Sequence, residues 1–293
     1  MFEQAFGKRP GERKGHAKGA FDAGSFYPAS EAQALSRSPL FRGSPVPAVV
    51  RFSMAGGDLD VAENARSPRG MAVQFRLSDG RVHNLAGLNA PVFAASTPET
   101  FLGLLRAGLP DADGKRNMQR ISAFREQHPD TLGQWQWLQE NRPPWSYLTS
   151  AYHGLHTFFL VDSRNEQHAV RWHLVPENSE RMLTESELAA APSNFLAARL
   201  EEMQAGGPAR FVWQVTLAAS GDDLLDPAHA WPDERSRVSL GVLELDRAAG
   251  DQCAGINFDP MVVAEGVEAS DDPFLRIRST AYAISFGKRL SGQ

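Results

Sequence analysis

The chain has 293 residues, of which 42% are hydrophobic and 22% are charged, and its formal net charge is −5. This composition is typical of a soluble globular protein with an ordinary core. The negative charge argues against a nucleic-acid partner, and the absence of any long apolar run argues against a membrane span. We find no repeat, low-complexity tract or linker, so the sequence predicts a single domain over residues 1–293.

Cysteine usage and the N-terminus bear on the cellular compartment. Cys253 is the only cysteine, which excludes a disulfide framework and a zinc cluster. No basic residue lies near it in residues 250–255, so we expect an inert thiol. Residues 1–9 do not have the pattern of a signal peptide. We therefore expect a cytoplasmic protein, or a periplasmic one if a leader has been removed.

Short alternating segments predict strands in the first part of the chain, after an irregular Gly-, Lys- and Arg-rich stretch at 1–24. The motif Ser96-Thr97-Pro98-Glu99 predicts the start of a helix, because it combines a capping residue with a proline suited to the first turn. The strands expected here are 49–54, 71–77, 82–85 and 91–94.

Residues 108–150 indicate a helical or irregular insertion, after which strands resume. A capping box at residues 184–187 predicts a helical region that breaks near Pro192 and ends at 206–207. The later strands are expected at 156–161, 170–174, 211–217 and 238–245. About eight short strands with added helices indicate an α+β fold built on an antiparallel barrel or sandwich.

The last predicted helix, at 270–287, carries the most informative pair of side chains. Ser270 suits its start and Gly287 its end. Arg278 and Tyr282 are one turn apart, so a guanidinium can stabilise a phenolate, which is a good ligand for ferric iron. Alone, the pair equally fits a surface cation beside a half-buried ring. The apolar stripe that we expect to pack is Phe274, Ile277, Ala281 and Ile284.

Several motifs, read in chain order, resemble the haem core of catalases, and most closely that of the shorter catalase-related peroxidases. This resemblance covers about residues 13–289 and implies an antiparallel eight-stranded β-barrel with added helices. It also implies haem b as the cofactor, with the proximal ligand on the C-terminal helix. The matching segments are 13–19 (RKGHAKG), 50–53 (VRFS), 67–75 (SPRGMAVQF), 152–158 (YHGLHTF), 231–232 (WP), 258–260 (FDP), 266–270 (GVEAS) and 278–282 (RSTAY).

The resemblance implies a role for each side chain of the haem site. Tyr282 matches the proximal iron ligand, and Arg278 the arginine that keeps this phenolate ionised. His16 matches the distal acid–base, and Ser53 the serine that holds its ring by a hydrogen bond. Candidates for contacts to the haem are Arg13, Arg51 and Arg289 at the propionates, and Phe93 and Phe101 as distal walls.

Two further residues are matched to the proximal network, and one assignment stays open. His173 matches a histidine that orients Arg278, and Asp272 matches an acid nearby. Arg289 is adjacent to Lys288, so the spacing could favour either cation. His156 is assigned no chemistry.

The departures from catalase bear on activity. Leu88 takes the place of the distal asparagine, although a one-residue shift could bring in Asn89. Ser67 replaces an aspartate that catalases have near their main channel. These changes predict an oxidoreductase that reduces organic hydroperoxides, and hydrogen peroxide weakly, with a small organic electron donor and little catalase activity.

Three alternatives remain at this point: a true catalase, a hydroperoxide isomerase of the allene oxide synthase kind, and a haem-binding protein without turnover. The expected partners are a peroxide and a small organic reductant, with no nucleic acid and no membrane. The arm that interlocks catalase tetramers has no counterpart, so we expect no interlocked tetramer, and a homodimer is compatible with the sequence.

Overall fold

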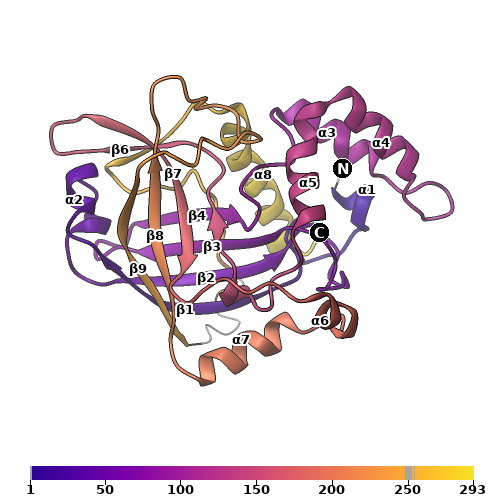
Figure 1. Cartoon of the computed structure of the whole chain (residues 1–293), viewed down its shortest axis with the longest axis horizontal. Coiled ribbons are helices and arrows are strands. Elements are labelled where there is room, and N and C mark those ends of the chain that lie inside the picture. Colours follow the sequence, from indigo (N-terminus) through magenta and orange to yellow (C-terminus); the bar gives the residue numbers. More distant parts are fainter. Residues whose placement is uncertain (1, 248–252, 254) are drawn as a thin grey trace.

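The computed structural model describes residues 2–247, 253 and 255–293. Its centre is a 10-stranded antiparallel sheet, of which eight strands close into a barrel (Figure 1). Closure comes from the pairing of β7 with β8, and β6 (Phe158–Val161) and β10 (Val267–Ala269) extend the sheet beyond β7. The barrel strands are β1 (Gly19–Pro28), β2 (Val46–Met54), β3 (Arg69–Arg76), β4 (Val82–Leu88), β5 (Tyr152–His153), β7 (Gln167–Pro176), β8 (Ala209–Leu217) and β9 (Arg237–Arg247).

The predicted eight-stranded barrel is thus confirmed, with corrections to its strands. The strand expected at 156–161 corresponds to β6, which lies outside the barrel, and the barrel strand β5 was not expected. Residues 91–94 form no strand, because the Phe93 amide donates to the Pro227 carbonyl instead of joining a ladder. β1 was not predicted: its first residues belong to the stretch 1–24 that is irregular in sequence, and the strand continues to Pro28. Its glycines and polar residues mask the alternation, yet it pairs along its length with β2 and β9.

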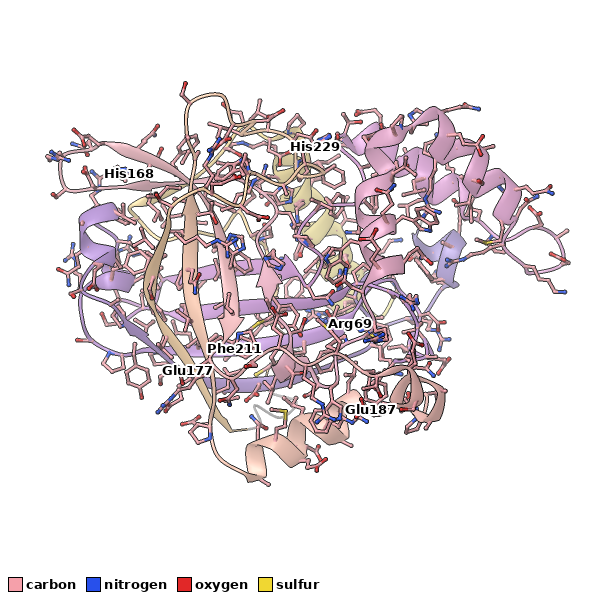
Figure 2. The ribbon with its side chains drawn as sticks, in the orientation of Figure 1. Arg69, His168, Glu177, Glu187, Phe211 and His229 are labelled. Atoms are coloured by element: carbon pink, nitrogen blue, oxygen red, sulfur yellow. The ribbon has the colours of Figure 1, made fainter. Side chains whose placement is uncertain are left out.

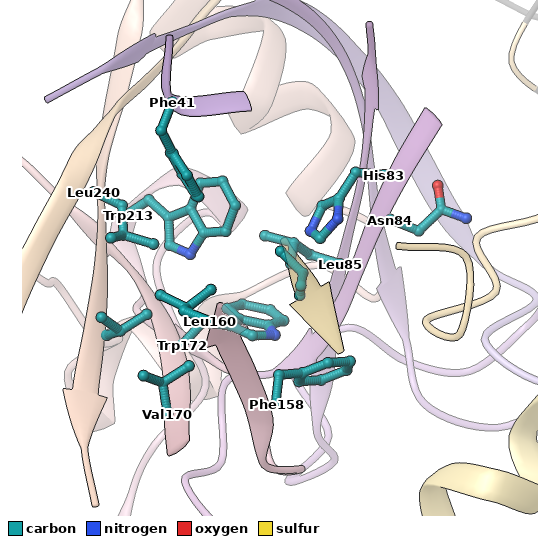
Figure 3. A pocket seen from close by; sticks show the side chains of 12 residues that line it. Phe41, His83, Asn84, Leu85, Phe158, Leu160, Val170, Trp172, Trp213 and Leu240 are labelled. Carbon is teal, nitrogen blue, oxygen red and sulfur yellow. The ribbon is translucent and has the colours of Figure 1, made fainter. Parts of the chain in front are cut away.

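The barrel interior is filled by aromatic and aliphatic side chains (Figure 3). Phe75 and Trp213 stack with their ring centroids 5.1 Å apart, and Phe26 lies across both. The space left among the core side chains is a cavity of about 20 Å³. That volume suits a single water molecule at most. A cofactor must therefore bind on the outside of the barrel.

Helices cover the barrel unevenly (Figure 1). The expected insertion contains α4 and α5, which lie with α3 as a lobe on one side, and α7 runs along another face. None of the helices in the described part of the chain is long and apolar enough to cross a bilayer. The helices are α1 (Phe2–Phe6), α2 (Ala32–Leu35), α3 (Pro98–Ala107), α4 (Met118–Gln127), α5 (Leu132–Glu140), α6 (Glu185–Ala190), α7 (Leu196–Ala205) and α8 (Pro273–Leu290), with short 3-10 turns at Pro39–Phe41, Pro129–Thr131 and Tyr147–Thr149.

The last helix, α8, differs from its prediction at both ends. Asp272, rather than Ser270, caps it by accepting from the amides of Phe274 and Leu275. The helix continues through Gly287, and the left-handed residue that follows its end is Gly292, at φ 67. A glycine stops a helix only where the backbone takes that conformation, and Gly287 does not.

The expected apolar stripe of α8 is also wrong. Phe274 is buried, but Ile277 and Ile284 are 50% and 60% exposed. The packed face is instead the one that carries Leu275 and Tyr282, so Arg278 and Tyr282 face the barrel.

Candidate active site

The proximal pair lies where α8 meets the outer face of the barrel. Arg278 donates to the Tyr282 hydroxyl oxygen at 3.0 Å. Tyr282 packs against a small buried cluster of Val49, Cys253 and Phe258, as do Phe21 of β1 and Ala72 of β3. The chain therefore presents a tyrosine oxygen, with a guanidinium beside it, on the outside of the barrel.

A buried histidine–carboxylate pair supports this helix, but the histidine is not the predicted one. His156 Nδ1 lies 2.5 Å from Asp272 Oδ2, and the two residues are 2% and 1% exposed. Burial lowers the pKa of His156 although Asp272 opposes the shift, and the nearby Arg278 lowers it further. Asp272 thus caps α8 and holds His156 at once. Its assignment to a proximal network stays a prediction.

The assignment of His173 to Arg278 is wrong. Its Nδ1 lies 2.9 Å from Nδ1 of His153, and its Nε2 lies 2.8 Å from the Thr216 hydroxyl. The histidine close to Arg278 is His156, which the sequence analysis left without chemistry. The burial of the Leu155-His156-Thr157-Phe158 motif was the signal that could have identified it.

The distal residues His16 and Ser53 are brought together. His16 Nδ1 lies 2.9 Å from Ser53 Oγ. His16 has a φ of 52, a left-handed conformation that costs a non-glycine residue on the order of 1 kcal/mol and is found preferentially at functional sites. Burial lowers its pKa to about 3, with further contributions from Arg51, Arg278 and Arg13. His16 is therefore neutral at neutral pH.

The register of the strands decides between Leu88 and Asn89. Ser53 is opposite Gly70, and Gly70 is opposite Leu88. A Cβ on Gly70 would lie 2.8 Å from both His16 Nδ1 and Ser53 Oγ, so this position needs a glycine. Since directly opposed residues point to the same face, Leu88 lies on the His16 face. Asn89 Oδ1 instead accepts from the Arg69 amide at 2.8 Å.

Three predicted arginines converge beside Tyr282. Arg13 and Arg289 both donate to the Ile256 carbonyl, at 2.9 and 3.2 Å. Burial lowers the pKa of Arg13 to about 9, with added repulsion from Arg51 and Arg289, and burial likewise lowers that of Arg51 to about 10. In the described part of the chain, Arg51 and Arg289 form no ion pair, and Arg51 Nε is a buried donor without a partner.

Lys288 is excluded from this arginine cluster, because it pairs with Glu3 at 2.9 Å. The open choice between the two neighbours thus falls to Arg289. Phe93 and Phe101 contact each other and Phe274 in the first turn of α8, with ring centroids 4.5 to 5.5 Å apart. Both thus pack against the start of the helix that carries Arg278 and Tyr282, and their predicted role as distal walls stays a prediction.

These residues fit a haem. Arg51 is buried with one guanidinium nitrogen unpartnered, which is costly, and a carboxylate would relieve it with a bidentate hydrogen bond. Haem carries two propionates, which the arginine cluster (Arg13, Arg51 and Arg289) can hold. The Tyr282 oxygen, as a phenolate, would be a suitable ligand for ferric iron. His16, held by Ser53, is placed to transfer a proton.

Comparison with known proteins gives the same picture. The catalase family profile matches residues 4–293. A catalase-related peroxidase of Synechococcus elongatus is 42% identical, over 99% of this chain and 87% of that protein. Another, of Mycolicibacterium paratuberculosis, is 37% identical over 95% of this chain and 89% of that protein.

Solved structures give the fold. A bacterial catalase superposes with a TM-score of 0.88 at 22% identity, covering 97% of this chain and 58% of that one. A fungal catalase gives 0.87, and 60% of its chain is covered. The chain thus spans about three fifths of the length of these catalases.

Proposed function

Since this chain belongs to the catalase family, we propose that it is a haem b peroxidase which reduces organic hydroperoxides with electrons from a small organic donor. The observation that carries the proposal is the Arg278–Tyr282 pair, packed on the outer barrel face within range of the arginine cluster. The net reaction is ROOH + 2 e⁻ + 2 H⁺ → ROH + H₂O. When bound, the haem supplies the electrons that break the O–O bond.

Tyr282 would hold the iron of the haem through its phenolate oxygen, and Arg278 would stabilise the negative charge on that oxygen by a hydrogen bond and by its own charge. His156 and Asp272 fix the first turn of the helix that carries both residues. Their role is to position the helix.

His16 moves the proton. With its Nδ1–H donating to Ser53 Oγ, Nε2 carries no proton and accepts one from the near oxygen of the hydroperoxide. It then returns this proton to the departing oxygen, which leaves as alcohol or water. A lowered pKa keeps His16 in the neutral form that can accept. Ser53 fixes which ring nitrogen faces the substrate.

Leu88 sets the preference for organic hydroperoxides and against dismutation. It places an apolar side chain on the His16 face, where it cannot orient a second hydrogen peroxide. An alkyl group of a hydroperoxide gains from contact with it. Electrons then come from a donor rather than from a second peroxide.

Turnover of the wild-type protein tests the proposal. Hydrogen peroxide and tert-butyl hydroperoxide are supplied with and without an oxidisable dye, and oxygen release and dye oxidation are followed together. We expect dye oxidation to exceed oxygen release, most clearly with the alkyl hydroperoxide. Vigorous oxygen release without dye would show a true catalase. No turnover with any donor would show a haem-binding protein.

A further inference from the structure

The short N-terminal helix α1 has no role in the chemistry proposed above. It spans Phe2–Phe6 and lies beside the end of α8 (Figure 1). A helix of five residues is not stable by itself in water. The contacts that α1 makes with the rest of the chain must therefore keep it in place.

Glu3 is the residue of α1 that connects the two sides of the candidate haem site. Its carboxylate accepts hydrogen bonds from the Lys288 ammonium at 2.9 and 3.0 Å and lies 3.5 Å from the Lys14 nitrogen. Lys288 belongs to α8, which carries the proximal pair. Lys14 belongs to residues 13–18, the distal segment, which carries His16. One carboxylate thus links the distal segment to the proximal helix.

Phe6, the last residue of α1, packs on a turn that supports the distal segment. A Cβ at Gly56 or at Gly57 would lie 3.3 or 3.2 Å from the Phe6 side chain, so the ring lies directly on this pair of glycines. The Gly56 carbonyl accepts from the amide of Ala17, which follows His16, at 3.0 Å. The ring of α1 therefore packs against the backbone that holds the distal histidine.

Lys14 adds a second link between the same parts of the chain. Its ammonium donates to the Arg9 carbonyl at 2.9 Å and to the Gln293 backbone oxygen, beyond the end of α8, at 2.8 Å. The Lys14 side chain is only 11% exposed. The segment that follows α1, the distal segment and the residues after α8 thus meet at one lysine.

These contacts are made next to the arginine cluster. Arg13 precedes Lys14, Arg289 follows Lys288, and both arginines donate to the Ile256 carbonyl. In the proposed function this cluster holds the haem propionates, while the distal segment and α8 face the two sides of the ring. A haem that leaves between them must part the distal segment from α8. The contacts of Glu3 and Phe6 oppose that separation.

We propose that α1 is a strap that retains the haem, and that its release limits the rate of haem loss. The inference rests on the proposed haem site, and it adds two residues, Glu3 and Phe6, which retain the cofactor without binding it. Exposed ion pairs contribute little stability each, and the Phe6 ring is only half-buried. The strap can therefore open while the barrel stays folded.

Transfer of haem from the holoenzyme to excess apomyoglobin measures this loss. Glu3→Gln removes the charge that pairs with Lys288 and Lys14, so haem should leave about fivefold faster. Phe6→Ala removes the ring from the glycine turn, so haem should leave about tenfold faster. The effects of two separate contacts add in free energy, so the double variant should lose haem about 50-fold faster.

A matched control separates the strap from a general effect of surface charge. Glu177→Gln removes another exposed glutamate that pairs with an arginine, Arg210, at 3.8 Å. It lies on the opposite side of the barrel from α1 (Figure 2), so haem loss should not change. Because salt screens exposed ion pairs, sodium chloride at about 1 M should speed haem loss from the wild type and not from Glu3→Gln. Circular dichroism melting checks that each variant is folded.

Covalent closure of the strap tests the opposite direction. In Glu3→Cys/Lys288→Cys, bismaleimidoethane can join the two new thiols, while Cys253 is buried and protected from the reagent. Linking should reverse the about fivefold acceleration that loss of the ion pair causes, and should bring haem loss below the wild-type rate. The single variant Lys288→Cys, treated in the same way, should not slow.

The rate of the peroxide reaction per bound haem should stay the same in the Glu3 and Phe6 variants. Unchanged haem loss in the folded Glu3→Gln and Phe6→Ala variants, or no slowing on linking, would overturn the inference. A slower peroxide reaction with unchanged haem loss would also overturn it, because α1 would then position His16 instead. None of these results affects the proposed function. A wild-type protein that binds no haem would overturn the proposed function itself.

Discussion

The two sides of the candidate haem site are built in different ways. On the proximal side, Asp272, Arg278 and Tyr282 belong to one helix and its cap, so their relative positions follow from helix geometry. On the distal side, His16 comes from an N-terminal segment, Ser53 from β2 and Leu88 from β4. Contacts between distant parts of the chain bring these three together.

This difference separates retention of the cofactor from its reactivity. A proposed ligand fixed by one helix would hold the iron whether or not the distal residues are in their best positions. A distal face assembled from three segments can change its chemistry through one side chain while the haem stays bound. Substitutions on the two sides should therefore give different phenotypes.

Removal of the proximal oxygen should have the largest effect. Tyr282→Phe keeps the ring that packs against Val49, Cys253 and Phe258 but removes the proposed iron ligand, so the protein should lose or greatly weaken haem binding. Haem content per chain, from the ultraviolet-visible spectrum and the pyridine haemochrome, measures this loss. Tyr27→Phe, at a tyrosine that is 46% exposed on β1, is the matched control. Wild-type haem content in Tyr282→Phe would refute the proximal assignment.

Loss of the distal histidine should leave haem content intact and slow the reaction. His16→Ala should react with peroxide at least ~100-fold more slowly, which is the usual contribution of general acid–base catalysis. Ser53→Ala keeps the imidazole but frees its ring, so a smaller loss of about fivefold is expected from one hydrogen bond. Stopped-flow measurement of the peroxide-dependent spectral change gives both rates. An unchanged rate in His16→Ala would remove this residue from the mechanism.

The same difference explains what the sequence could reveal. Arg278 and Tyr282 are four residues apart, and helix geometry alone predicts that they share a face. His16 could not be found from local pattern, since a histidine in a Gly- and Lys-rich segment is ordinarily solvated, and only the family motif indicated it. Alternation predicted most strands of a barrel or sandwich, but not β1, where glycines hide the pattern, nor the two-residue β5, and only the family resemblance indicated a barrel.

The sequence alone did not predict the register of the strands or which face of α8 is buried. His156 precedes β6, and His173 lies in the neighbouring strand β7. Only the folded structure shows that His156 is the one that approaches Arg278. α8 has apolar side chains on more than one face, so its sequence alone did not show that Ile277 and Ile284 would remain exposed. Both errors concern which face of an element meets the core.

Protonation of His83 should destabilise the barrel. Burial lowers the pKa of His83 to about 3, and its Nδ1 accepts from the Ala264 amide at 3.0 Å. The unfolded chain binds this proton below about pH 6.5, whereas the folded chain does not until about pH 3. Stability is therefore lost as the pH falls through that window.

At pH 5 this single group should cost about 2 kcal/mol relative to pH 7. Urea unfolding of the wild type and of His83→Phe at both pH values measures it. The substitution should reduce the loss of unfolding free energy between pH 7 and pH 5 by that amount. An equal loss in both proteins would show that His83 is protonated in the folded chain.

The smallest effect is expected at Leu88, where the distal face differs from catalase by a hydrogen-bond donor. A donor that acts in a transition state is worth on the order of 100-fold, but Ser67 and the pocket shape also differ from catalase, so Leu88→Asn should recover only part of it. We expect a several-fold rise in oxygen evolution from hydrogen peroxide, with unchanged haem content and little change in dye oxidation. Leu88→Met, which remains apolar, should evolve no more oxygen than the wild type. If Leu88→Met and Leu88→Asn raise oxygen release equally, space rather than the missing donor limits the second peroxide.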